Sequence, residues 1–132
     1  MKNINDIKVG DEFYLEKEID KYRPIYYAGA SGDFNPIHID PEFGRIVGLD
    51  GIILHGLCTM AYVCQLNTDW IGDPGAIKKL KVRFVKPVRP DDIIKVSGKV
   101  IEKEGNRVKC TLVATNQNGV EVIDKAFSEI KL

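Results

Sequence analysis

The feature that most constrains the fold is a long stretch of chain without any charged side chain. Residues 52–66 contain no Asp, Glu, Lys or Arg and are mostly aliphatic, aromatic or cysteine residues. A helix that is apolar on nearly every side lies buried among other elements, and about 11 to 15 residues are too few to span a bilayer. We therefore predict a central buried helix around which the rest of the chain folds.

The second half of the chain carries the alternation expected of strands. Leu80, Val82 and Phe84 alternate with basic residues, which is the period of a half-buried strand. Further strands of the same kind, separated by turn residues, are predicted at residues 93–101, 108–115 and 120–130. Because consecutive strands joined by short turns pair antiparallel, we expect a curved antiparallel sheet wrapped around the helix, an α+β architecture.

The first half of the chain is predicted to be mainly helical. Apolar patterns there predict a strand at residues 13–19, a helix at residues 21–30 and a short helix at residues 42–47. Glycine, proline and other helix-breaking residues predict a loop at residues 31–41. Asp20 is the candidate N-cap of the first helix and Asp40 that of the second, which should end at Gly48. With neither internal repeats nor a linker in the sequence, we expect residues 1–132 to form one domain.

Composition limits the partners and the compartment. The 19 basic and 19 acidic residues give a formal net charge of zero, whereas nucleic-acid-binding domains usually carry a basic excess. No apolar stretch approaches the roughly 18 residues of a membrane span, and no secretory signal is recognised. The three cysteines form no CxxC pair, and two histidines make a zinc site hard to assemble. We expect a reduced, soluble, cytoplasmic protein without metal, nucleotide or redox cofactor and without nucleic-acid or membrane partners.

The candidate chemistry lies in one polar segment, residues 27–40. Asp33 and His38 are five positions apart, which on a continuous helix would leave them roughly 140° apart around the axis. Pro36 breaks such a helix, so a tight loop can turn both side chains toward one point, where they could share a water molecule as acid and base. The alternative is that Asp33 only caps a turn and that His38 is a buried structural imidazole.

The same segment resembles a family signature. From Tyr27 to Asp40 it reads aromatic, small residues, then Ser-Gly-Asp-x-Asn-Pro-hydrophobic-His-x-Asp. This is similar to the signature of the MaoC-like (R)-specific enoyl-CoA hydratases, the hydratase 2 family, and most resembles their single-hot-dog (3R)-hydroxyacyl-thioester dehydratase subunits. Further similarity lies in residues 47–50, 53–57, 72–76, 82–85 and 87–90. The resemblance implies a hot-dog fold, in which a sheet wraps a long helix, and a homodimer with the substrate tunnel at its interface.

The resemblance also implies an activity. This is the reversible syn addition of water to a trans-2-enoyl thioester, which gives the (3R)-hydroxyacyl thioester. Asp33 and His38 would share the catalytic water, one activating it and the other protonating the α-carbon. The substrate would bring its own coenzyme A or carrier-protein phosphopantetheine, so no separate cofactor is implied.

The negative charge that develops on the thioester oxygen needs hydrogen-bond donors. Gly56 lies near the predicted start of the buried helix, and a helix N-terminus offers free N–H groups and a positive dipole end. Its amide is the oxyanion candidate, as the resemblance also suggests; the alternative is that Gly56 only allows close packing. His55 is expected to be structural or a cap rather than catalytic. Asn35 is a candidate for orienting the loop or binding the water, and Ser31 and Thr59 are candidates for contacting substrate.

Several interpretations stay open at this point. Lys79, Lys81 and Arg83 form a polar strand face that is either a solvated sheet surface or a landing site for the phosphates of coenzyme A or an acidic carrier protein. The chain could also be a subunit of a hetero-oligomeric dehydratase, a hot-dog acyl-thioesterase, or a module that binds acyl thioesters without chemistry. The presence of Asp33 and His38 in this order favours a hydratase and an active chain.

Overall fold

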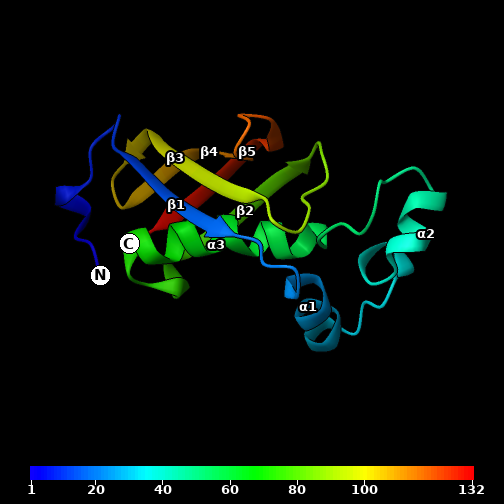
Figure 1. Cartoon of the computed structure of the whole chain (residues 1–132). Helices are drawn as coiled ribbons and strands as arrows, with labels where there is room; N and C mark the ends of the chain where they lie inside the picture. Colours follow the sequence, from blue (N-terminus) through cyan, green and yellow to red (C-terminus); the bar gives the residue numbers. More distant parts are fainter.

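The computed structural model describes all 132 residues, and Figure 1 shows the order of its elements. The strands are β1 (Glu12–Glu18), β2 (Ile77–Phe84), β3 (Ile93–Glu104), β4 (Arg107–Thr115) and β5 (Glu121–Lys131). The α-helices are α1 (Arg23–Ser31), α2 (Pro41–Ile46) and α3 (Gly56–Ile71), and short 3-10 turns occupy Ile4–Asp6, Pro36–His38 and Pro74–Ala76. Every strand and helix predicted from the sequence is present, with ends that differ by a few residues.

The five strands form one antiparallel sheet in the order β1-β3-β4-β5-β2. Turns at Gly105 and Gly119, both with positive φ, join β3 to β4 and β4 to β5. The prediction that consecutive strands pair is confirmed for these two hairpins. It is wrong for β2, which pairs with β5 and not with β3. The physical reason is the position of α3, which contacts both edge strands and therefore delivers the chain to the edge opposite β1.

Helix α3 packs on one face of the sheet and forms the core with it (Figure 1). Its residues Val63, Leu66 and Ile71 are buried. Buried and less buried residues alternate along β3 and β4, so each of these strands turns one face toward the helix. This arrangement confirms the predicted α+β architecture of a sheet around a central helix.

The start of α3 at Gly56 agrees with the prediction, whereas the burial of the helix differs from it. Residues 52–55 are not helical, because the backbone N–H of Leu54 donates to the Val88 carbonyl at 2.8 Å and holds this part of the chain extended. The helix is also not buried on every side, since Leu57 is 62% exposed and Ala61 is exposed as well. One flank of α3 is therefore open in the single chain. None of the helices is both long and apolar enough to cross a membrane.

Figure 1 shows α1 and α2 at the end of the molecule where α3 begins. The predicted cap at Asp40 is confirmed, because its side chain accepts hydrogen bonds from the first backbone N–H groups of α2. The predicted cap at Asp20 is wrong: the N-cap of α1 is Tyr22, whose N–H donates to the Asp20 side chain at 2.9 Å. Since Pro24 occupies the first turn, where its fixed φ and missing N–H are tolerated, the helix starts next to it and not at residue 21.

Candidate active site

The polar segment identified in the sequence folds into a tight loop between α1 and α2. Helix α1 ends at Gly32, whose φ of 75° is the left-handed conformation that glycine adopts readily. The side chain of Asn35 then accepts a backbone hydrogen bond at 3.2 Å and caps the 3-10 turn Pro36–His38. These two changes of direction bring Asp33 and His38 to one side of the loop.

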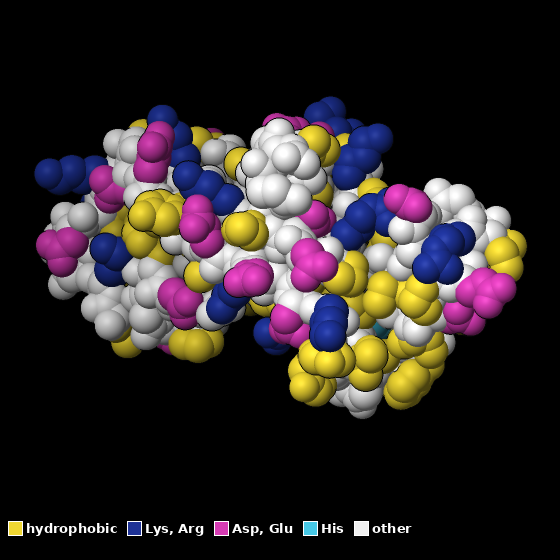
Figure 2. Space-filling model, in the orientation of Figure 1, with side chains coloured by type: hydrophobic (Ala, Val, Ile, Leu, Met, Phe, Trp, Pro, Cys, Tyr) yellow, Lys and Arg dark blue, Asp and Glu magenta, His cyan; other side chains and the backbone are white.

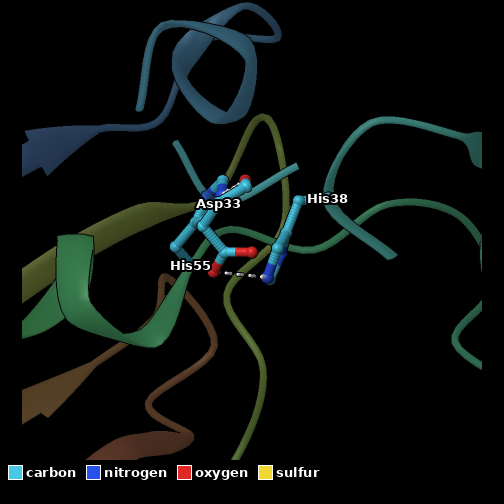
Figure 3. A group of neighbouring side chains, drawn as sticks. All are labelled: Asp33, His38 and His55. Atoms are coloured by element: carbon cyan, nitrogen blue, oxygen red, sulfur yellow. Dashed lines mark hydrogen bonds and ion pairs between the residues drawn. The ribbon is translucent and has the colours of Figure 1, made fainter. Parts of the chain in front are cut away.

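Asp33 and His38 face each other at short range (Figure 3). The Oδ2 atom of Asp33 lies 3.9 Å from Nε2 of His38. The Asp33 side chain is 54% exposed and the His38 side chain only 9%. The carboxylate is therefore open to solvent, whereas the imidazole is held inside the protein.

Hydrogen bonding fixes the orientation of the His38 ring. Its Nδ1 atom lies 2.8 Å from the carbonyl oxygen of Ile53. Because a carbonyl oxygen only accepts, Nδ1 carries the hydrogen and the neutral ring presents a lone pair at Nε2. A carboxylate and an imidazole lone pair 3.9 Å apart are both within reach of the two O–H groups of one water, since each such bond is about 2.8 Å long.

A cavity of about 420 Å³ opens beside this pair of side chains, and its wall includes His38, Gly56 and Thr59. The rest of the wall is mostly apolar, with Leu49 and Phe84 among its residues. An apolar cleft with a few converging polar groups is the usual form of a small-molecule site.

Gly56 is the first residue of α3, and its amide points to no acceptor within the protein. Neither Gly56 N–H nor Leu57 N–H makes a hydrogen bond, as expected for the first turn of a helix. A Cβ atom at residue 56 would also lie 3.2 Å from the ring of Phe84, so close packing is a second reason for glycine here. A free amide at the positive end of a helix, exposed beside a cavity, can receive a developing negative charge.

The other predicted site residues have more local roles. The Ser31 hydroxyl donates to the Tyr27 carbonyl at 2.7 Å and accepts from the Asp33 N–H at 3.2 Å, so it is engaged in the loop. Asn35 uses its side-chain oxygen for the cap. Thr59 is buried in the cavity wall, and its hydroxyl makes no hydrogen bond with the rest of the protein. Of these three, Thr59 is therefore the one placed to contact a ligand.

One polar residue of the site was underestimated from sequence. His55 occupies the N-cap position of α3, yet its side chain makes no capping hydrogen bond. Its Nε2 lies 2.9 Å from the main-chain oxygen of Asp33, and its ring stacks on that of His38, with centroids 3.8 Å apart. No local pattern could have revealed this contact, because it joins residues 22 positions apart.

Asp33, His38 and His55 each place one potential metal-ligand atom within 4.8 Å of the others (Figure 3). The two histidines thus meet in space, contrary to the expectation that a zinc site would be hard to assemble. However, the rings are stacked with 23° between their planes, so their in-plane lone pairs do not converge on one point as the ligands of a metal must. The donor geometry suits acid–base chemistry better than metal binding.

The basic face of β2 is largely neutralised by β5. Lys79 lies 3.7 Å from a carboxylate oxygen of Glu129, and Arg83 binds Asp124 through two hydrogen bonds. These bonds hold the pKa of the Asp124 carboxyl below its usual value. The structure therefore favours a solvated sheet surface here over a landing site for phosphates.

An antiparallel sheet around a central helix, with an Asp–His pair beside the free amides of that helix, defines the class: a hot-dog-fold protein with a carboxylate–imidazole pair at the start of its central helix. The chain belongs to the MaoC-like domain family, whose model matches residues 6–122.

Individual relatives agree with this membership. The chain is 38% identical over 104 residues to the peroxisomal multifunctional enzyme type 2 of Mus musculus, a match that covers 76% of this chain and 13% of that protein. It is 32% identical over 119 residues to the 3-hydroxybutyryl-CoA dehydratase of Methylorubrum extorquens, covering 89% of this chain and 76% of that protein. The mouse protein is thus far longer than this chain.

A solved structure extends the comparison to three dimensions. The unliganded R-hydratase PhaJ1 from Pseudomonas aeruginosa superposes with a TM-score of 0.89 at 28% identity, covering 97% of this chain and 83% of that one. The hot-dog fold predicted from the family signature is thereby confirmed.

Proposed function

We propose that this protein catalyses the reversible hydration of trans-2-enoyl thioesters to (3R)-hydroxyacyl thioesters. The observation that carries the proposal is the 3.9 Å approach of Asp33 Oδ2 and His38 Nε2 beside the free amide of Gly56. The relatives support the same activity, because one is named a 3-hydroxybutyryl-CoA dehydratase and a structural neighbour an R-hydratase.

The reaction follows from the positions of these groups. A water that donates to both Asp33 and His38 keeps its oxygen lone pairs free to attack the β-carbon of the enoyl group. One of the two side chains takes the proton of the water, and a proton is delivered from the pair to the α-carbon on the same face. The thioester oxygen, negative in the enolate, accepts a hydrogen bond from the Gly56 amide. Dehydration retraces these steps.

Two conservative variants test the roles of the pair. A positioned acid or base contributes about 10² to 10⁴ in rate, so Asp33→Asn and His38→Gln should each lower hydration of crotonyl-CoA at least about a hundredfold. Both variants should keep the unfolding midpoint of the parent protein within a few degrees. A variant that retains the parent rate would remove its residue from the mechanism.

The same substrate separates hydration from the competing functions. Loss of the enoyl absorbance of crotonyl-CoA without release of free thiol indicates hydration, whereas release of thiol indicates a thioesterase. Binding of crotonyl-CoA without either change indicates a module that binds thioesters without chemistry. The proposal predicts the first outcome.

We also propose that the protein acts as a homodimer. The outer edge of β2 is unpaired, and next to it Leu57, Phe84 and Val85 are 62%, 50% and 41% exposed. A second copy that covers this edge would bury these apolar side chains beside the cavity. Light scattering of the purified protein tests the dimer. An active monomer would contradict it, and an inactive homodimer would favour a hetero-oligomeric dehydratase in which this chain is one subunit.

The remaining parts of the proposal concern the substrate carrier and the compartment. Water addition by acid–base groups needs no separate cofactor, so the thioester supplies its own coenzyme A or phosphopantetheine. We place the protein in the cytoplasm, where its free thiols at Cys58, Cys64 and Cys110 stay reduced. Cell fractionation with a specific antibody tests this location, and activity on crotonyl-CoA against crotonyl-carrier protein tests the carrier.

A further inference from the structure

His55 touches both members of the Asp33–His38 pair. It is 2% exposed, its Nε2 lies 2.9 Å from the Asp33 main-chain oxygen, and its ring stacks on His38 (Figure 3). The ring of Tyr27 from α1 also packs against it, with centroids 4.7 Å apart. The mechanism above assigns nothing to this side chain.

The surroundings of the two ring nitrogens of His55 favour a single tautomer. The Asp33 carbonyl oxygen only accepts, so Nε2 of His55 carries the hydrogen. The Nδ1 atom is buried and has no hydrogen-bond partner, so a hydrogen placed there would be a buried donor without an acceptor. Both nitrogens therefore favour the Nε2–H form, whereas His38 has the opposite Nδ1–H form.

Packing alone does not require a histidine at residue 55. An apolar aromatic ring would fill the same buried space and would leave no unpaired nitrogen. What only a donor can supply is the bond to the Asp33 carbonyl. Residues 31–36 are all exposed, so this bond is an anchor from the loop to the rigid start of α3.

We propose that His55 is a positioning residue of the hydration reaction. Its Nε2–H holds the backbone of Asp33, and its ring supports the face of His38, so that the carboxylate and the imidazole reach one water together. Because Gly56 follows directly in the chain, the same residue sets the distance from the pair to the oxyanion amide. The predicted effect of His55 on the reaction rate rests on the proposed function, whereas its predicted hydrogen bond and tautomer do not.

A matched pair of variants tests the kinetic consequence. The amide nitrogen of Gln can take the position of Nε2, whereas that of Asn, one methylene shorter, cannot reach it. A misplacement of about 1 Å can lower a rate about a hundredfold, so His55→Asn should lose about that much in kcat on crotonyl-CoA. His55→Gln should stay within about tenfold of the parent kcat, and KM should change less than about threefold in both. Equal kcat values in the two variants, or a loss confined to KM, would overturn the proposal.

A spectroscopic measurement tests the structural consequence without any activity. The chain has two histidines, so ¹⁵N spectra of the imidazoles contain two ring systems, and His55→Gln identifies which belongs to residue 55. We expect the hydrogen of the His55 ring to lie on Nε2. An Nδ1–H form would overturn the proposal. If crotonyl-CoA is not hydrated at all, this result still decides the placement of His55 while the proposed function fails separately.

Discussion

Substitution of Gly44 by alanine should disable the site through a backbone collision that the structure locates. Gly44 is buried in α2, and a Cβ atom there would lie 2.1 Å from the carbonyl oxygen of Gly51, about 1.3 Å closer than the 3.4 Å at which ordinary contact begins. The atoms that this Cβ would meet all belong to the backbone of Gly51, so no flexible side chain can move aside. Two residues beyond Gly51, the Ile53 carbonyl accepts the hydrogen bond that orients His38.

The expected size of the effect follows from this displacement. Forcing extra volume into a packed contact lowers stability by about 1–3 kcal/mol, and a shift of about 1 Å at a reacting group can lower a rate about a hundredfold. We therefore expect Gly44→Ala to be folded in the absence of urea but to unfold at a lower urea concentration than the parent. It should hydrate crotonyl-CoA about a hundredfold more slowly.

Gly29→Ala is the matched control, since it also lies in a helix. A Cβ atom at residue 29 would meet nothing within 4 Å, and replacing a helical glycine by alanine raises stability by about 0.5–1 kcal/mol. This variant should be at least as stable as the parent and equally active. Parent-like stability in Gly44→Ala would refute the close approach of the two backbones, and reduced stability with full activity would refute its link to His38.

Three further predictions concern the core and the sheet surface. Ser128→Ala removes a buried hydroxyl that donates to Asn67 at 2.7 Å, so urea unfolding should show a loss of about 1–3 kcal/mol; a loss near zero would mean that water replaces the hydroxyl. Burial raises the pKa of the Cys110 thiol from 9.0 to about 11. Folding then favours the neutral thiol, so stability should fall as the pH rises from 9 through 11, and urea midpoints should fall less steeply in Cys110→Ala than in the parent. Arg83 holds the pKa of Asp124 below 3.8, a contribution that is present above pH 3.8 and lost as the pH falls below it. The melting temperature of Arg83→Gln should therefore be lower than that of the parent at pH 7 and equal to it at pH 2. A difference in melting temperature that persists at pH 2 would contradict the ion pair as its cause.

Much of the fold was predictable because its signals are local. The alternation along β3 to β5 and the turn residues between these strands determined both hairpins, and Asp40 identified the start of α2. The position of β2 was not predictable, because it depends on the path of α3 across the sheet. The extended conformation of residues 52–55 was not predictable for a similar reason: the pairing of Leu54 with Val88 joins distant segments, and the apolar composition of these residues is equally compatible with helix and extended chain.

The candidate site was likewise only partly predictable from the sequence. The Asp33–His38 pair came from a compact motif whose proline and glycine force a tight loop, and the Gly56 amide came from the end of an apolar run. His55 could not be assigned, since its contacts with Asp33 and His38 arise only when the start of α3 packs against the loop. The apolar flank of α1 was also unexpected: Figure 2 shows hydrophobic side chains gathered over this helix, of which Ile25 and Tyr26 are 52% and 66% exposed.

The configuration of the product tests the central claim most directly. The purified protein is incubated with crotonyl-CoA, and the hydroxyacyl product is analysed on a chiral phase together with the products of Asp33→Asn and His38→Gln. If both side chains hold one water on a single face of the enoyl group, the product is the (3R) enantiomer. Its rate of formation is then at least about a hundredfold lower in both variants than in the parent. An (S) or racemic product, or (3R) product formed undiminished without either side chain, would contradict the account.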